Sequence, residues 1–219
     1  MNSKNVIATN VCELMSLAVQ LRTDWFPHEP SWGPWFRGHT NADWKLSPNL
    51  YRSGAPKRGM RIIEDEIRQE FIMRAPSLTD KGPQNSWEWY FTMQHSGAPT
   101  RLLDWTEGVL IAAYFAVKNN FGNCDAAVWV LHPWWLNKLV VNEREVVPPG
   151  AEIGISKQDA DRYSPWLPDR YSAAKLPELP AAVYPTHSIR RISTQRSCFT
   201  IHGSEIDGFE NLSRKLKLT

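Results

Sequence analysis

The side chains best suited to chemistry are concentrated between residues 94 and 106. This segment reads Gln-His-Ser-Gly-Ala-Pro-Thr-Arg-Leu-Leu-Asp-Trp-Thr and stands just ahead of an apolar run. A histidine beside a buried aspartate can hold one tautomer and act as a general acid or base. We therefore predict His95 and Asp104 as catalytic residues, with Gln94 and Arg101 as substrate-binding residues in the same cluster.

Purely structural roles for these side chains stay open. Asp104 could cap the helix that follows it, which is the more common role for an aspartate there, and Arg101 could form an ion pair with Asp104. His95 could bond to the backbone of its own turn. We favour His95 as the chemical residue because Gly97 and Pro99 place it in a sharply bent loop rather than on an apolar face.

Arg37 supplies a second functional group. It precedes a glycine at the end of a short predicted strand, 35–37, and that glycine lets another backbone or a ligand approach closely. The planar guanidinium suits a phosphate or pyrophosphate, while an internal ion pair with Asp104 is an equal alternative. Gln195 adds a further donor from a strand-like, arginine-rich segment. We expect these groups to converge with segment 94–106 on one cleft.

Composition excludes several classes of protein. With 25 Lys and Arg against 23 Asp and Glu, the long-range field that draws basic proteins to nucleic acids or anionic membranes is weak. The sequence has no signal-peptide core and no apolar run long enough to span a bilayer, so we expect a soluble, cytoplasmic protein. Scattered histidines, three unpaired cysteines and the absence of a glycine-rich phosphate loop predict no metal site and no tightly bound cofactor.

Helices and strands are mixed along the chain. Apolar spacing predicts helices over 10–23 and 61–74, the second with acids 64–66 complementing its dipole. Two more helices are expected over 87–95, ended by the turn at 96–99, and over 109–117, capped by Asp104 or Thr106. Strands are expected at 35–37 (closed by Gly38), 125–131 (a central strand), 181–184, 191–194 and 198–202. Prolines rule out long regular elements from 142 to 180, and a basic, helix-like tail covers 209–217.

This pattern lacks a regular strand–helix–strand alternation. It predicts an α+β fold in which residues 1–219 form a single domain, with a twisted, mostly antiparallel sheet flanked by helices. Eleven tryptophans are present, and most should fill the core because each buries a large apolar area. One or two could instead form a stacking wall for a planar ligand such as a nucleobase or nicotinamide.

Three segments together resemble the FRG domain family, named after its Phe-Arg-Gly tripeptide: residues 36–38, 94–106 and 191–199. The resemblance covers residues 30–203 and leaves the N-terminal helix and the C-terminal basic tail as extensions. Ser197 departs from the family pattern, which has a glycine between the glutamine and the phenylalanine. The toxin and defence-type domains that accompany family members imply an effector of bacterial or phage conflict.

A weaker similarity connects the chain to the ADP-ribosyltransferase superfamily. It rests on Arg37 in its aromatic-Arg-Gly context, on Ser193-Thr194 and on the predicted antiparallel core. In that superfamily the strand arginine grips the nucleotide, the Ser-Thr step braces the site, and an acid stabilises the sugar cation that forms as nicotinamide leaves. The similarity implies Ser193 as a substrate-binding residue and NAD as a substrate. The acid is missing from its expected motif, and Glu205 is the nearest one.

Three functions fit these residues. The first is an NAD-using enzyme, either an ADP-ribosyltransferase or an NAD glycohydrolase. The second is a metal-independent RNase or phosphodiesterase in which His95 and His202 act as acid and base. The third is a non-catalytic sensor module that binds a nucleotide or a protein. We expect a nucleotide or NAD as partner and no membrane. A protein or nucleic-acid target stays open, and the sequence specifies no oligomeric state.

Overall fold

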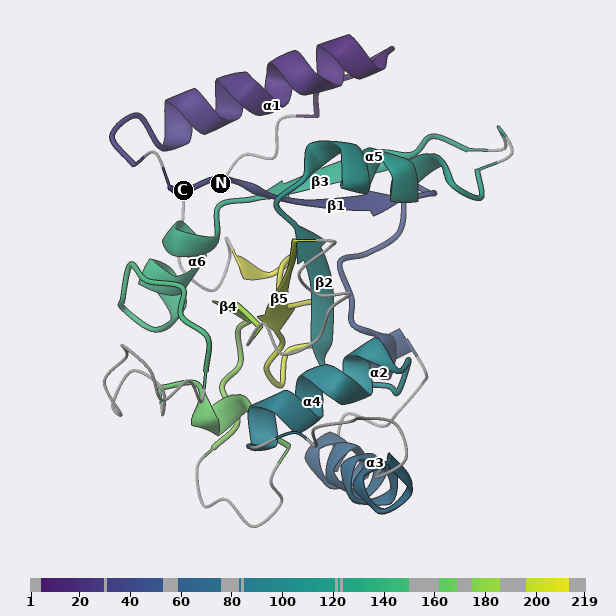
Figure 1. Ribbon diagram of the computed structural model, residues 1–219, viewed down its shortest axis with the longest axis vertical. Helices are drawn as coiled ribbons and strands as arrows, with labels where there is room; N and C mark the ends of the chain where they lie inside the picture. The colour runs from purple at the N-terminus through teal and green to yellow at the C-terminus, as the bar shows by residue number, and fades with distance from the viewer. Residues whose placement is uncertain are drawn as a thin grey trace.

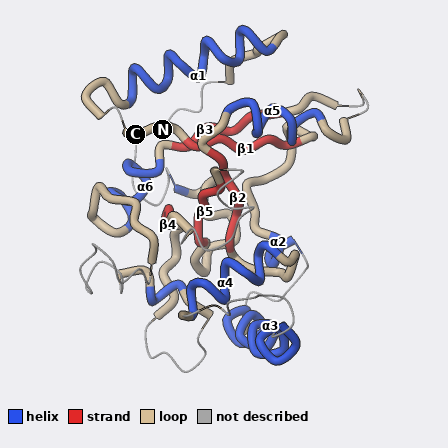
Figure 2. The backbone as a smooth tube through the Cα atoms, in the orientation of Figure 1, coloured by secondary structure: helices blue, strands red, loops and turns tan. Residues whose placement is uncertain are grey.

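The protein has an α+β fold, seen in a computed structural model (Figures 1 and 2). No helix within the described part of the chain is long and apolar enough to cross a membrane. The residues that the structure describes are 5–29, 31–52, 59–75, 83, 85–120, 122, 124–149, 162–168, 175–185 and 196–212.

Five antiparallel strands form one sheet in the order β3-β1-β2-β5-β4. Pairing runs over five residues between β1 and β3 and over five between β2 and β5, but β1 and β2 share one recorded pair, Phe36 opposite Thr106. The sheet therefore consists of two halves joined at a single point, and Figure 1 shows β1 and β3 lying crosswise to β2. The strands are β1 (Trp35–His39), β2 (Leu102–Thr106), β3 (Ala127–Leu131), β4 (Ala181–Val183) and β5 (Ser197–Ile201).

The helices cover different parts of this sheet. Two of them, α1 (Val11–Trp25) and α5 (Val109–Val117), lie over the β1–β3 half, and α5 packs mainly on β1 (Figure 1). The start of β2 lies near α2 (Asn49–Arg52) and α4 (Ser86–His95), and α3 (Met60–Arg74) packs against α4 (Figure 1). α6 (Pro133–Val140) packs against β4, and a short 3-10 helix covers Ser164–Trp166.

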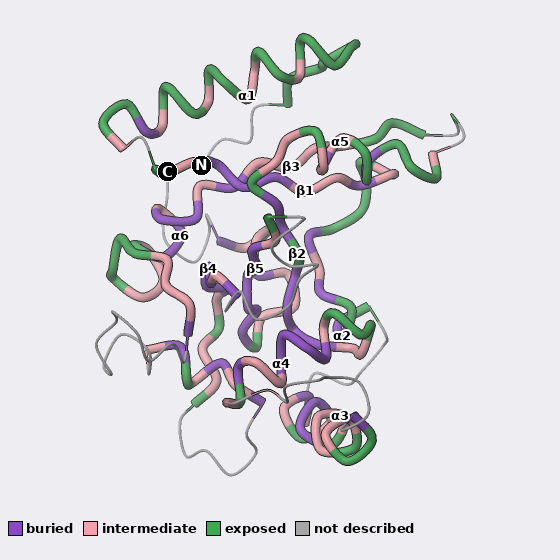
Figure 3. Tube along the Cα trace, in the orientation of Figure 1, coloured by how far each residue is buried: buried purple, intermediate pink, exposed green. Residues whose placement is uncertain are grey.

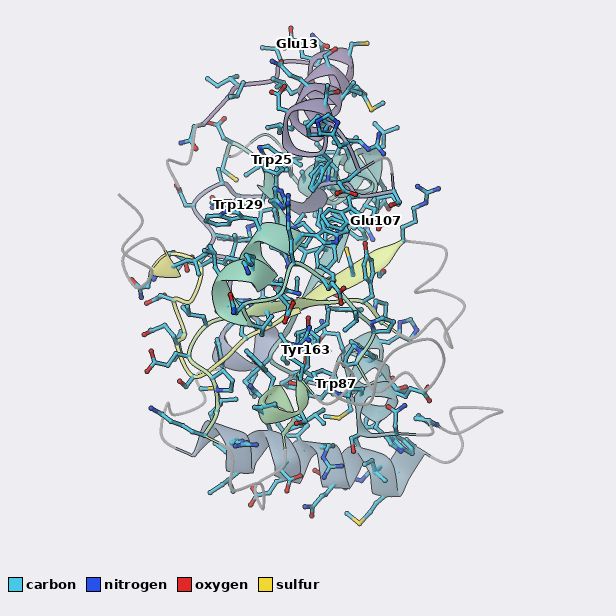
Figure 4. The ribbon with its side chains drawn as sticks, turned by 90° about the vertical axis from the view of Figure 1, so that its left-hand side faces the viewer. Glu13, Trp25, Trp87, Glu107, Trp129 and Tyr163 are labelled. Carbon is cyan, nitrogen blue, oxygen red and sulfur yellow. The ribbon has the colours of Figure 1, made fainter. Side chains whose placement is uncertain are left out.

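Apolar side chains cover both faces of the β2–β5 half. One cluster joins α4 to the sheet through Trp87, Phe91, Leu102 and Phe199, and the other gathers Trp35, Leu103 and Trp105. Adjacent residues of β2 thus enter different clusters, which agrees with the buried strands in Figure 3. In Figure 4, Trp87 and Tyr163 mark the first cluster, and Trp129 lies toward the second.

Local sequence signals located most helices. The helices predicted at 10–23, 61–74, 87–95 and 109–117 are confirmed to within two residues, and the side chains of Asn10 and Asn85 cap α1 and α4. The strands predicted at 181–184 and 198–202 are confirmed as β4 and β5. The strand predicted at 191–194 and most of the tail at 209–217 lie outside the described residues.

Several predictions were wrong in ways that have a physical reason. Neither Asp104 nor Thr106 is the N-cap of α5: residues 102–106 form β2, and Gly108 is the cap. Gly38 does not close β1, which continues to His39 because both residues pair with β3. The apolar run at 125–131 forms β3 at an edge of the described sheet rather than in its centre, with α5 beside it.

Two further corrections concern helices. The acids of α3 do not lie in its first turn, and Glu64 and Asp65 are buried partners of other polar groups rather than surface complements to the dipole. α6 was not among the predicted helices, although Pro133 occupies its start and His132 caps it by accepting a hydrogen bond from the backbone N–H of Trp135 at 3.1 Å.

Gly38 is the point where β1 touches α5. A Cβ atom at this position would lie 1.9 Å from the carbonyl oxygen of Ala112 and 2.6 Å from the backbone nitrogen of Ala116. Both alanines are buried, so small residues on the helix and a glycine on the strand bring the two backbones together. The close approach that the sequence left open is therefore made by protein backbone.

Gly38→Ala should destabilise the fold, because neither backbone can retreat without opening the contact between β1 and α5. We expect the free energy of unfolding in urea to fall by about 1–3 kcal/mol. Gly33→Ala is the matched control: its Cβ would meet Arg22 Nε at an ordinary 3.7 Å, and we expect a change below about 1 kcal/mol. Equal unfolding midpoints for Gly38→Ala and wild type would contradict this account.

Candidate functional site

Arg37 lies where the two halves of the sheet separate. Its Nη1 donates to the backbone carbonyl of Asp104 on β2 at 2.6 Å, across a region where β1 and β2 do not pair. The side chain is half-buried, and among the described residues it forms no ion pair with the Asp104 carboxylate. Nη2 has no hydrogen-bond partner within the described chain. The guanidinium therefore keeps donors available for a ligand.

His39 holds the other side of this guanidinium. Arg37 Nε donates to His39 Nε2 at 2.9 Å, and Trp129 Nε1 donates to His39 Nδ1 at 3.1 Å. Burial, then the charges of Arg37 and Arg52, lower the pKa of His39 to about 4, so the ring is neutral at pH 7. A neutral imidazole has one acceptor nitrogen. Two donors thus compete for one lone pair, and the ring can satisfy only one of them at a time.

A short chain of hydrogen bonds orients the carboxylate of Asp104. Gln94 Nε2 donates to Asp104 Oδ2 at 2.7 Å, and the hydroxyl of Thr100 donates to Gln94 Oε1. Thr100 is buried and also accepts from the backbone N–H of Leu102 at 3.1 Å. This chain links the end of α4 to β2 and leaves the Asp104 carboxylate exposed but fixed in direction.

Positive charge and an aromatic ring border this site. Burial lowers the pKa of Arg37, the carboxylate of Asp104 opposes that shift, and the charge of Arg52 adds to it. Arg52, at the exposed end of α2, thus brings a second cation near the first. The ring of Trp44 lies 6.1 Å from that of His39, in an edge-to-face arrangement. Two arginines, one oriented carboxylate and an aromatic surface can together receive an anion attached to a planar group.

Arg101 has a structural role in place of the predicted substrate contact. It is fully buried, with Nε on Glu64 Oε2 at 2.6 Å, Nη1 on the carbonyl of His202 at 2.7 Å and Nη2 on the carbonyl of Trp166. Its own N–H bonds to Glu64 Oε1 and to the hydroxyl of Tyr90, each at 2.9 Å. The ion pair envisaged with Asp104 thus forms with Glu64 instead.

Charges in this buried group reinforce one another. Burial lowers the pKa of Arg101, but the carboxylate of Glu64 and the nearby tyrosine hydroxyls more than offset that effect, and the net shift is upward. Burial and the same carboxylate raise the pKa of Tyr90. The arginine therefore stays charged and the phenol stays protonated, as their hydrogen bonds require.

His202 is enclosed in the same region. It is fully buried, and its Nε2 lies 3.4 Å from Thr200 Oγ1, which accepts from Trp105 Nε1 at 3.0 Å. Its Nδ1 has no partner among the described residues. Burial, together with the charges of Arg101 and Arg37, lowers the pKa of His202 to about 3. An inaccessible neutral ring is poorly placed to exchange protons with a substrate.

The remaining predicted residues take different positions. His95 is exposed at the end of α4, next in sequence to Gln94. Ser193 and Gln195 lie outside the described residues. Glu205 follows β5, and its backbone N–H bonds to the carbonyl of Glu178 at 3.1 Å. The structure thus joins Arg37, Gln94 and Asp104 in one network, leaves His95 exposed one residue after Gln94, and binds Arg101 in a separate buried cluster.

His39 and Trp129 belong to this network but were not among the predicted site residues. His39 stands two residues after Arg37, and the period of two in a strand places both side chains on one face, so this signal was available. Trp129 gave no such signal, because only the pairing of β3 with β1 sets it opposite Arg37. Glu107, labelled in Figure 4, also escaped notice; it accepts from the hydroxyl of Tyr184 at 2.8 Å.

Residues 33–123 match the model of the FRG domain family. The match includes β1, α4, β2 and α5, and it ends before β3, whereas the resemblance noted in the sequence extended to residue 203. It therefore contains Arg37, Gln94, His95, Arg101 and Asp104. Comparison with curated proteins and with solved structures found no match.

Arg101→Met should strongly destabilise the protein, because it leaves the carboxylate of Glu64 buried without a counter-charge. We expect the free energy of unfolding in urea to fall by about 3–5 kcal/mol. Arg74→Met is the matched control: Arg74 pairs with Glu70 at 2.6 Å on the exposed face of α3, and we expect a loss below about 1 kcal/mol. Similar losses in the two variants would show that Arg101 is not a central support.

Acid should weaken the fold partly through His202. Because its folded pKa of about 3 lies below the ordinary value, the unfolded chain binds a proton in acid that the folded protein does not. The resulting stability is complete above about pH 6.5 and is lost toward pH 3, at up to about 1.4 kcal/mol per pH unit. We expect the free energy of unfolding in urea, taken as wild type minus His202→Gln, to fall by about 2 kcal/mol between pH 7 and pH 5.

The exposed His28 provides the control for this pH dependence. His28→Gln should follow the wild-type line over the same range. Parallel lines for wild type and His202→Gln would mean that the protonation of His202 does not contribute to acid sensitivity.

Proposed function

This chain carries an FRG domain over residues 33–123, and from that premise we propose that it is a nucleotide-processing enzyme with NAD as its substrate. Arg37 holds the phosphates of the nucleotide at the split of the sheet, and Asp104 and His95 stand beside it as the reactive side chains. The protein is then an effector of the ADP-ribosyltransferase or NAD glycohydrolase kind, acting in bacterial or phage conflict.

The observation that carries this proposal is the hydrogen bonding of Arg37. A structural arginine such as Arg101 has its donors filled by buried acceptors, whereas Arg37 leaves Nη2 without a partner in the described chain and shares the single acceptor of His39 with Trp129. A phosphate oxygen would accept from Nη2 and from Nε together and leave the acceptor of His39 to Trp129. The described part of the protein thus offers fewer hydrogen-bond acceptors than Arg37 and Trp129 have donors, and a bound anion would supply the missing ones.

Electrostatics support an anionic ligand of more than one charge. Arg52 adds a second positive charge near Arg37. Asp104 supplies a negative charge, and the hydrogen bond from Gln94 orients its carboxylate. Opposite charges side by side suit a molecule that carries phosphates at one end and develops positive charge at the other. Cleavage of NAD does this: the ribose–nicotinamide bond breaks, its electrons leave with nicotinamide, and the sugar becomes a cation that a water or a target side chain captures.

In this scheme Asp104 stabilises the sugar cation, which gives it the role of the acid missing from the expected motif. His95 accepts the proton of the attacking water or target group from its exposed place beside Gln94. Gln94 positions Asp104. Ser193 and Gln195 remain proposed substrate contacts.

The geometry supports the RNase or phosphodiesterase alternative less well than the NAD-using enzyme, but it does not separate that enzyme from a sensor. An RNase or phosphodiesterase with His95 and His202 as its acid–base pair needs both imidazoles at one accessible site, and His202 is fully buried. A sensor module needs only the binding half of the site, so the arrangement around Arg37 serves it equally well. Turnover separates the sensor from the enzyme.

Arg37→Lys should weaken nucleotide binding much more than it weakens the fold, because lysine keeps the charge but loses the planar fork. We expect the affinity for ADP, measured by calorimetric titration, to fall by about 10- to 150-fold, which is the value of a charge-assisted hydrogen bond. Nicotinamide release from NAD, followed chromatographically, should fall at least as much. The free energy of unfolding should change by no more than about 1–2 kcal/mol.

Arg144→Lys, at an exposed arginine after α6, is the matched control and should leave binding and turnover unchanged. An Arg37→Lys protein with wild-type affinity and turnover would remove Arg37 from the site. ADP binding without nicotinamide release by wild type would favour the sensor, and RNA cleavage in the presence of a chelator would favour the phosphodiesterase.

A further inference from the structure

Trp44 differs from every other tryptophan of the chain. All eleven lie within the described residues, and ten of them are buried or partly buried, whereas 52% of Trp44 is exposed. An exposed indole is unusual in a chain that places its other ten tryptophans in or against its core. The burial of apolar surface therefore does not explain this residue.

The loop that carries Trp44 is held in place on both sides. The backbone N–H of Ala42 bonds to the carbonyl of Asp125 at 2.8 Å, and the N–H of Trp44 bonds to the carbonyl of Asn41 at 3.3 Å. On the far side, Lys45 forms a salt bridge with Asp207 at 2.8 Å. The ring of Trp44 is thus presented by an anchored loop, which lowers the entropy lost when a ligand packs on it.

Trp44 lies next to His39, the ring that accepts a hydrogen bond from Arg37. Its ring centroid lies 6.1 Å from that of His39, which receives the hydrogen bond of Arg37 Nε at 2.9 Å. One imidazole thus separates the exposed indole from the guanidinium. A ligand that accepts from Arg37 and extends past His39 meets the indole next.

We propose that Trp44 stacks on the heterocyclic base of the nucleotide whose phosphates bind at Arg37. This inference rests on the proposed function and adds to it the residue that selects a phosphate joined to a planar ring over inorganic phosphates. Every base has a π face, so one tryptophan recognises a base without selecting among bases. Selectivity for nucleotides as a class comes from Trp44, and the attraction of anions comes from Arg37 and Arg52.

Paired titrations with ADP and with inorganic pyrophosphate separate these two contributions. Trp44→Ala should lower the affinity for ADP by about 5- to 150-fold, the range found for loss of one stacked base, and should leave the affinity for pyrophosphate within about twofold. Trp44→Phe should keep most of the affinity for ADP. Arg37→Lys should weaken the binding of both ligands.

The control for Trp44→Ala is Tyr114→Ala, which removes an aromatic ring of similar exposure (54%) from α5. Gly38 turns toward α5, and Arg37, its neighbour in the strand, points to the other face of the sheet, so Tyr114 lies away from the site. Tyr114→Ala should bind both ligands as wild type does. Circular dichroism melting of each variant checks that the loop substitutions leave the fold intact.

The possible failures are distinguishable. If Arg37→Lys weakens both ligands and Trp44→Ala weakens neither, the stacking role of Trp44 is wrong and the anion site stands. If Trp44→Ala weakens both ligands equally, Trp44 supports the loop and does not stack on a base. If wild type binds neither ADP nor pyrophosphate, the proposed function and this inference both fail.

Discussion

The other parts of this fold depend on the hydrogen bonds and the ion pair that the buried guanidinium of Arg101 makes. It bonds to α3 through Glu64, to the 3-10 helix through the carbonyl of Trp166, and to the end of β5 through the carbonyl of His202. Its backbone N–H meets Glu64 and Tyr90, which brings in α4. One side chain thus fixes the direction in which the chain enters β2. Isolated buried charges are strongly unfavourable, so this arrangement is stable only as a complete set.

The position of the candidate site follows from that anchor. Arg101 fixes the start of β2, and Asp104 follows Arg101 by three residues along this strand. The hydrogen bond from Gln94 then directs the carboxylate of Asp104. On the other side of the split, the contact of Gly38 with α5 holds β1 in place. Each residue of the Phe-Arg-Gly tripeptide therefore makes a different contact. Phe36 makes the backbone pair with β2, Arg37 points into the split, and Gly38 admits the helix.

The sequence predicted those features that local rules determine. Apolar spacing located α1 and α3, and the turn signal at 96–99 located the end of α4, because both signals involve residues that are close in sequence. The strand β2 was missed because it is buried on both faces apart from Asp104, so it lacks the alternation by which a half-buried strand is recognised. Arg37, Gln94 and Asp104 were selected from their chemistry. The exchange of Asp104 for Glu64 as the partner of Arg101 depended on how α3 packs, which no local pattern encodes.

The single pair that joins the two halves of the sheet has a consequence for regulation. Arg37 supplies, from a side chain, a hydrogen bond to β2 that a strand ladder would ordinarily supply from the backbone. The group proposed to hold the ligand is therefore also part of the joint between the halves. Coupling of this kind is reciprocal: if a partner that fixes the angle between the halves changes the affinity for a ligand at Arg37, that ligand changes the affinity for the partner by the same factor.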